Sequence, residues 1–146
     1  RDINTNSVVL RLTYHGRRHL LTGKATKQSE QSKQVTLKAE TLRTAVLKVA
    51  HHGSKNSSTA GFLTAVGAPA SVIMCARENS YGHPHPATMA RLEAANLAIF
   101  STALDGTVTL QIRTDRWSLS GEASGRKFIL MPPSPEILYD SAATSD

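Results

Sequence analysis

The sequence predicts a layered α/β domain. Short runs of β-branched and apolar residues recur along the chain, and stretches with helical spacing of apolar residues lie between several of them. The order is strand, strand, weak helix, strand, helix, strand, helix, strand, strand, and such alternation is typical of α/β layers. The 146 residues, 40% of them hydrophobic, suffice for one domain with a buried core.

The first elements predict a β-hairpin and then a buried strand. Residues 7–13 (SVVLRLT) and 18–23 (RHLLTG) have the composition of strands, and the turn between them carries Gly16. Residues 24–44 are polar and lack an apolar stripe, so we expect a surface helix or loop there. Residues 45–50 (AVLKVA) then predict a buried strand that ends at a His-His-Gly sequence.

The middle of the chain predicts alternating helices and strands. Hydroxyl residues precede a helix over 59–67, which a glycine closes. Residues 70–76 predict a strand, and a proline opens the helix expected over 86–96. Strands are predicted over 97–101 and, after an Asp-Gly turn, over 107–112.

Four of the six histidines fall in two loops, each directly after a predicted strand. His51 and His52 follow the first strand, and His83 and His85 follow the next strand along the chain. Functional groups collect at the carboxyl ends of parallel strands, so the two loops are expected to meet. Imidazole binds zinc, manganese or iron and titrates near neutral pH. Each pair alone has a simpler interpretation, as a surface feature or a rigid proline-bounded turn.

Polar side chains surround the histidines in both loops. The first loop adds hydroxyl groups next to a helix N-terminus, an environment that suits anions: Ser54, Ser57 and Ser58. In the second loop, Asn79 and Tyr81 have side chains that can bind phosphate oxygens. The net charge of +6 favours a polyanionic partner such as nucleic acid, although a solvated basic surface explains it equally well. No apolar run is long enough to predict a membrane span.

Several motifs occur together in one order: residues 6–12, LLTG at 20–23, VLKVAHHGS at 46–54, NSYGHPHP at 79–86 and DGTV at 105–108. Over residues 4–110 the chain resembles the metallo-β-lactamase-like domain of the ComEC family of DNA-internalisation competence proteins. The resemblance implies a four-layered αββα sandwich, of which this chain is the C-terminal half with about six to seven strands and two to three helices. It also implies a phosphodiesterase or nuclease with one or two zinc or manganese ions.

The resemblance assigns roles to the residues of the two loops. His52, or its neighbour His51, matches the last metal-ligand histidine. The catalytic residues implied in the second loop are His83, Asn79 and Tyr81. The substrate-binding residues expected around them are Ser54, Ser57, Ser58 and His85.

Two departures from the family pattern predict that this chain alone is inactive. The main His-x-His/Asp-x-Asp-His ligand motif of the family is absent from the sequence. Where the family has the aspartate that bridges two metals, this chain has Lys24. An ammonium group has no lone pair and carries the same sign of charge as the metal, so it repels the ion.

The motifs and the departures from the family pattern leave three functional hypotheses. The chain is part of a metal-dependent hydrolase, a catalytically silent domain that binds single-stranded DNA or another phosphodiester polyanion, or a truncated fragment without function. The expected partners are the missing N-terminal half of the domain or a second copy of the chain.

We expect residues 1–113 to form the half-domain, 114–131 to add a strand or extension (127–131), and 132–146 to be disordered.

Overall fold

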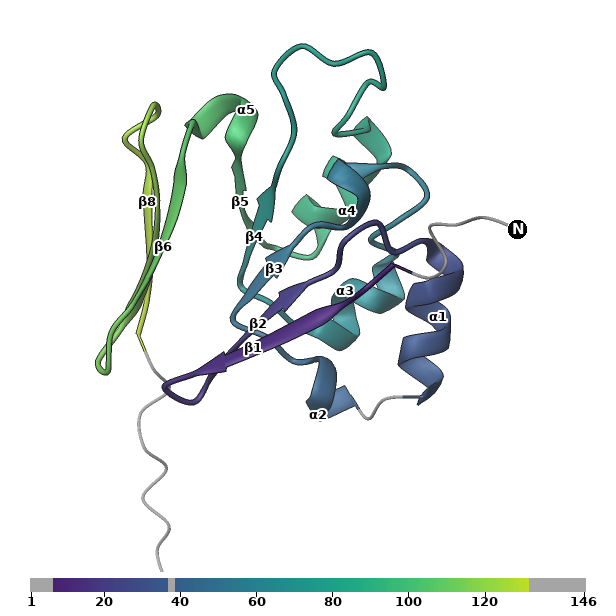
Figure 1. The fold of residues 1–146 in the computed structure, drawn as a ribbon, viewed down its shortest axis with the longest axis horizontal. Helices are drawn as coiled ribbons and strands as arrows, with labels where there is room; N and C mark the ends of the chain where they lie inside the picture. Colours follow the sequence, from purple (N-terminus) through teal and green to yellow (C-terminus); the bar gives the residue numbers. More distant parts are fainter. Residues whose placement is uncertain (1–6, 37–38, 132–146) are drawn as a thin grey trace, which may run out of the picture.

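A computed structural model, which describes residues 7–36 and 39–131, shows a layer of helices on one face of a five-stranded sheet and a three-stranded sheet on the other (Figure 1). The mixed α/β class is therefore confirmed. Three layers are present, and no helix of the described residues covers the outer face of the smaller sheet. The four-layered αββα sandwich is thus not confirmed.

The larger sheet holds its strands in sequence order. It consists of β1 (Leu10–Tyr14), β2 (Arg17–Leu21), β3 (Val46–Lys48), β4 (Ala70–Ile73) and β5 (Ala98–Ser101). The first two strands form the predicted antiparallel hairpin, and β2 to β5 run parallel. The loops that follow β2, β3 and β4 therefore leave the same edge of the sheet, as the sequence predicted for the two histidine loops.

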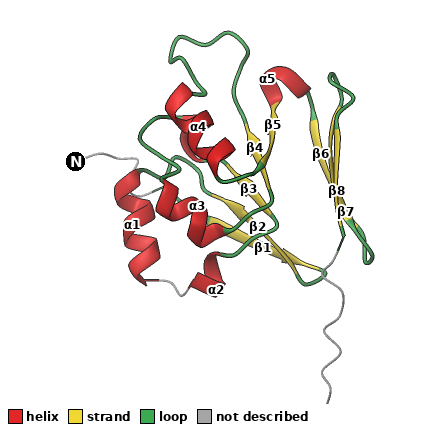
Figure 2. Cartoon of the chain, turned by 180° about the vertical axis from the view of Figure 1, so that it is seen from behind, coloured by secondary structure: helices red, strands yellow, loops and turns green. Residues whose placement is uncertain are grey.

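Helices supply the layer on one face of this sheet, as Figure 2 shows. They are α1 (Lys27–Thr36), α2 (Ala39–Leu42), α3 (Ala60–Val66) and α4 (Pro86–Ala94). A short helix, α5 (Thr102–Asp105), instead connects β5 to the smaller sheet. None of the helices in the described part of the chain is long and apolar enough to cross a bilayer.

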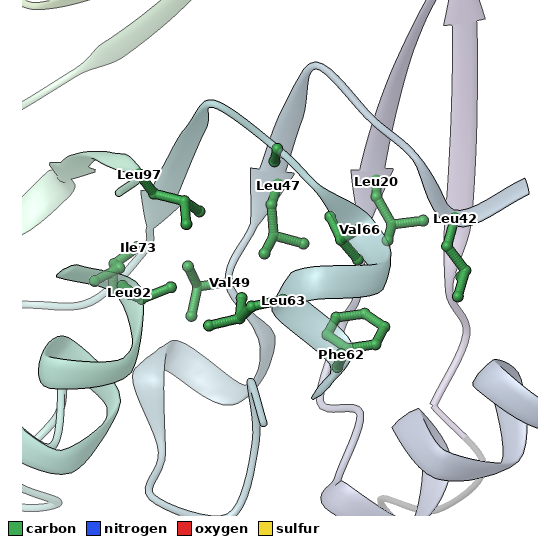
Figure 3. Packing of buried hydrophobic residues seen from close by; sticks show 11 residues of the cluster. Leu20, Leu42, Leu47, Val49, Phe62, Leu63, Val66, Ile73, Leu92 and Leu97 are labelled. Atoms are coloured by element: carbon green, nitrogen blue, oxygen red, sulfur yellow. The ribbon is translucent and has the colours of Figure 1, made fainter. Parts of the chain in front are cut away.

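The main core lies between the larger sheet and the helices (Figure 3). Leu47 and Ile73 project from neighbouring strands, and Phe62 and Leu92 meet them from α3 and α4. Each of these side chains is at most 2% exposed. Burial of one such side chain contributes about 1.5–3 kcal/mol, so this core fixes the position of the helices and of the loops before them.

The smaller sheet packs against the opposite face. It consists of β6 (Val108–Ile112), β7 (Trp117–Gly121) and β8 (Lys127–Leu130), which pair antiparallel in sequence order. Alternation along β7 directs Trp117 and Leu119 inward, and both are at most 1% exposed. They form a second core with residues of the larger sheet, namely Val46, Ala70 and Phe100.

The inner face of the larger sheet is covered only in part. The second core involves β3, β4 and β5, whereas every residue of β1 is exposed. The exposed apolar side chains on and beside this hairpin are Leu10, Leu12, Tyr14, Leu21 and Met74. A contiguous apolar surface of this kind marks an interaction site or a site of self-association. We refer to these five residues as the β1 face.

The structure refines the sequence prediction at three places. In the polar stretch 24–44 it has α1 and α2, and in the predicted extension 114–131 it has β7 besides β8. The Asp-Gly turn at 105–106 is the end of α5 followed by a glycine with a positive φ of 70°. The predicted disorder of 132–146 lies outside the described residues, and the division at residue 113 stays a prediction, although β6 and β7 pair across it.

Asp105 joins α5 to the smaller sheet and makes stability depend on pH. Its carboxylate is fully buried and accepts hydrogen bonds from the Ser124 hydroxyl at 2.6 Å and the Ser101 amide at 2.7 Å, while Arg126 lies 3.4 Å away. Burial acts to raise the pKa of Asp105, but the hydrogen bonds and the Arg126 charge outweigh it, so the pKa is lowered from 3.8. The stabilisation is present above that value and is lost as the pH falls below it.

We therefore expect Asp105→Asn to lower the free energy of unfolding at pH 7 by about 1.5–3 kcal/mol, the usual contribution of hydrogen bonds to a charged group. Asp115→Asn is the matched control, because Asp115 is exposed and pairs with Arg116 at 3.6 Å. It should change stability by less than about 1 kcal/mol. Urea unfolding measures the free energy of unfolding of both variants. The loss of stability in Asp105→Asn should become smaller as the pH falls below 3.8. A loss that stayed constant would contradict the stabilising role of the Asp105 carboxylate.

Candidate active site

Three loops meet at the carboxyl edge of the parallel strands. The loop after β2 contacts the loop after β3 where the His51 amide donates to the Gly23 carbonyl at 2.9 Å. The loop after β3 contacts the loop after β4 where the His85 amide donates to the Gly53 carbonyl, also at 2.9 Å. Lys24, which follows Gly23, is thereby brought beside the histidine loop, and its side chain is exposed.

The His-His-Gly segment, within the 3₁₀ turn Ala50–Gly53, has an unusual backbone. His51 and His52 both adopt left-handed conformations, with φ of 48° and 55°. A non-glycine residue in this region costs about 1–3 kcal/mol and persists only when the surrounding structure holds it there. The buried Ser57 hydroxyl helps because its single proton is shared between the carbonyls of Ala50 and Ser54, whose oxygens each lie 3.0 Å from Oγ. Strain of this kind is concentrated at functional sites.

His52 is held by one of its two ring nitrogens. Its Nδ1 lies 2.6 Å from the Met74 carbonyl oxygen, at the end of β4. Because a carbonyl only accepts, Nδ1 carries a proton, so in the neutral form of the ring the lone pair is on Nε2. Histidines that bind metals commonly have their second nitrogen bonded to a carbonyl in this way.

The rings of the two loops lie close together. The ring centroids of His51 and His83 are 6.1 Å apart, and those of His51 and His52 are 6.4 Å apart. Tyr81 is 80% exposed, and its ring stacks on His83 at a centroid distance of 6.0 Å. The two histidine loops therefore lie side by side, as the sequence predicted.

The surroundings of His83 favour the uncharged form of its ring. Burial lowers its pKa from 6.5, and the charges of His52 and His85 lower it further. Its Nδ1 is buried and, among the described residues, has no hydrogen-bond partner. A neutral imidazole with one open nitrogen can accept or donate a proton.

The side chains of Asn79 and His85 form hydrogen bonds within the second loop and at the start of α4. The Asn79 side chain accepts from the His83 amide at 2.9 Å and donates to the His83 carbonyl at 2.7 Å. His85 is the N-cap of α4, where its Nδ1 accepts from the Ala87 amide at 3.1 Å. Both residues thus shape the second loop, and the roles in catalysis and substrate binding predicted for them stay predictions.

The three serines of the first loop are buried. Ser54, Ser57 and Ser58 are at most 7% exposed, and the Ser57 hydroxyl proton is already shared between two carbonyls. The Ser58 hydroxyl has no partner among the described residues. The predicted contact with substrate is therefore least compatible with the position of Ser57, although it stays untested for all three.

Two charged residues that the sequence did not single out hold the first loop in place. Glu30 on α1 is fully buried, and its carboxylate accepts from the amides of Ser58 and Thr59. Burial is the main influence on the pKa of Glu30 and raises it, against the effect of these hydrogen bonds. Arg91 on α4 donates to the Ser58 carbonyl at 2.8 Å and to the Ser57 carbonyl at 2.9 Å. The polar sequence around Glu30 gave no signal for this role.

The described residues alone do not fit a complete metal site. Over 7–36 and 39–131, no three or more histidine, cysteine, aspartate or glutamate side chains are grouped so that they could hold one ion. Catalytic zinc sites use three protein ligands and a water. His52 offers one well-oriented nitrogen, so further ligands would have to come from outside this set.

Sequence similarity relates the chain to proteins of known name. No protein-family model matches the chain. The chain is 31% identical over 105 residues to ComE operon protein 3 of Bacillus subtilis and 34% identical over 114 residues to Recombination protein 2 of Haemophilus influenzae. It is 35% identical over 107 residues to Competence protein ComA of Neisseria gonorrhoeae. The chain is homologous to one segment of a competence-protein family.

The homologous segment is large in this chain and small in the relatives. The three alignments cover 72%, 77% and 73% of this chain but only 13%, 14% and 15% of the respective relatives. The predicted relation to competence proteins is therefore confirmed. The metallo-β-lactamase fold and the metal-dependent activity stay predictions.

Proposed function

We propose that this chain forms one wall of a phosphodiester-processing site in a protein of DNA uptake. The observation that carries the proposal is the His52 ring, whose Nδ1 is bonded to the Met74 carbonyl so that Nε2 is open. The neighbouring His51 and His83 rings add imidazoles that can contact a phosphodiester or relay a proton. The homology to competence proteins supports DNA as the substrate.

The metal of this site, zinc or manganese, would need ligands from another polypeptide segment. His52 would hold the ion together with that segment, which is either the preceding part of a longer protein or a second copy of this chain. The exposed β1 face supports such a partner, because its apolar side chains have no cover among the described residues. We therefore propose that the chain by itself binds its substrate without hydrolysing it.

A second candidate function, binding of a polyanion without catalysis, is favoured by Lys24. This lysine is exposed, and the preceding Gly23 is hydrogen-bonded to His51, so the backbone of Lys24 lies next to the first histidine loop. The net charge of the chain is +6. Both features favour attraction of phosphate groups.

Titration of single-stranded DNA at two salt concentrations tests these proposals. With three phosphate contacts, affinity should fall about 20-fold between 50 mM and 200 mM salt. Lys24→Gln should weaken binding and reduce the salt dependence by about one contact. Arg113→Gln, which removes a charge at the exposed turn after β6, is the control and should have a smaller effect.

Metal analysis and a cleavage assay complete the test. The purified chain should bind zinc or manganese weakly and leave DNA intact, and addition of the preceding segment should increase both metal content and cleavage. Salt-independent DNA binding would contradict the polyanion site. Cleavage that survives His52→Ala would remove His52 from the hydrolase site.

A further inference from the structure

A cavity of about 370 Å³ opens directly behind His83. It lies at the carboxyl ends of β4 and β5, between α4 and α5, and His83 and Pro84 form one of its walls. Its volume is near the lower limit of about 300–1,000 Å³ that is usual for small-molecule sites. The histidine site therefore continues inward into a space large enough for one small ring system.

The cavity is lined mainly by apolar groups. Ile73 and Ile99 come from neighbouring strands, Met89 comes from α4, and Leu104 comes from α5. Leu104 is 64% exposed and forms the rim, whereas Ile73 is fully buried and forms the floor. Apolar walls of this kind favour a flat, uncharged ring over a phosphate group.

The charged groups of the lining nearly balance each other. Arg126 is paired with the Asp105 carboxylate at 3.4 Å, and Glu93 at the rim opposes the charge of Arg77. The Arg77 Nε donates to the Ala103 carbonyl at 3.1 Å, which holds its guanidinium at the mouth. Because these charges nearly cancel, the lining favours an uncharged group inside the cavity over a phosphate.

We propose that this cavity binds one nucleobase of the strand whose phosphate lies at the histidines. This inference rests on the proposed function and specifies its substrate as single-stranded DNA, since a base must leave its duplex to enter the cavity. The exposed Tyr81 ring, stacked on His83, supplies an aromatic surface outside the cavity on which a neighbouring base can stack. Bases stack on such rings regardless of sequence.

The three methionines of the chain make a direct test possible. Met89 lines the cavity, and Met131, 62% exposed, follows β8 away from it. In protein labelled with ¹³C in the methionine methyl groups, deoxyadenosine monophosphate should shift the Met89 signal through the ring current of adenine and leave the Met131 signal unchanged. Deoxyribose 5-phosphate, which has no base, should leave the Met89 signal in place.

A cavity-filling variant and its control complete the experiment. Ala103→Trp should fill the cavity and weaken deoxyadenosine monophosphate binding at least about tenfold, since the base would lose its apolar contacts with the lining. Ala94→Trp, on the exposed end of α4, should leave the affinity unchanged. Equal Met89 shifts with and without a base, or unchanged affinity in Ala103→Trp, would overturn the proposal.

The outcome is distinguishable from failure of the proposed function. If single-stranded DNA binds with the expected salt dependence but neither it nor the mononucleotide moves the Met89 signal, the base site is wrong and the phosphodiester site stands. If DNA does not bind at all, both proposals fail.

Discussion

Trp117→Ala is expected to lower the free energy of unfolding by about 3–5 kcal/mol, the usual cost of removing a buried aromatic side chain. Trp117 is fully buried, and its ring lies 5.9 Å from that of Phe128 on the neighbouring strand. It also contacts the larger sheet through the second core, which contains Phe100. Because few large side chains join the two sheets, the resulting cavity should loosen the whole smaller sheet.

Two further variants give this prediction its controls. Ile129→Ala, on the same sheet but 49% exposed, should cost less than about 1 kcal/mol. Trp117→Phe should cost less than Trp117→Ala, because it keeps the aromatic packing and removes an indole nitrogen that has no hydrogen-bond partner among the described residues. Urea unfolding followed by circular dichroism measures all three, and equal losses for Trp117→Ala and Ile129→Ala would show that the sheets are not coupled through Trp117.

The fold class was accessible from the sequence because hydrophobic patterns determine it locally. Each parallel strand contains an apolar run, and the helices α3 and α4 each contain an apolar stripe. A glycine marks the end of α3, and a proline marks the start of α4. The strand β7 carries strict alternation at Trp117 and Leu119, so that signal was present but short. Helix α1 carried none, because the residues that it buries include Ser29 and Glu30, which are polar.

The hydrophobic pattern also predicted where the candidate site lies, because it marked the ends of the strands. It did not predict the detailed geometry of the site. The sequence put two histidine loops at the ends of neighbouring parallel strands, and topology then brought them together. It did not indicate the left-handed backbone of His51 and His52 or the anchoring of their loop by Glu30 and Arg91. The anchoring by Glu30 and Arg91 depends on contacts between residues more than 25 positions apart, which local patterns do not encode.

Gly53→Ala is expected to lower the free energy of unfolding by about 2–4 kcal/mol and to separate the two histidine loops. Gly53 has a φ of 83°, which an alanine adopts only with strain. A Cβ at this position would also lie 2.7 Å from the Pro84 Cβ, so the loop after β4 would have to move. Since His83 precedes Pro84, the same displacement should carry its ring away from His51 and weaken DNA binding.

Gly82→Ala separates the strain from the steric clash. Gly82 lies in the same site with a φ of 64°, but a Cβ there would meet no atom within 4 Å. This variant should therefore carry only the backbone term of about 1–2 kcal/mol and leave the loops in contact. Chemical-shift changes of the His51 and His83 rings, measured beside stability and DNA affinity, distinguish the two variants. If Gly53→Ala and Gly82→Ala lose equal stability and leave the histidine shifts unchanged, close packing of Gly53 on Pro84 does not hold the site together.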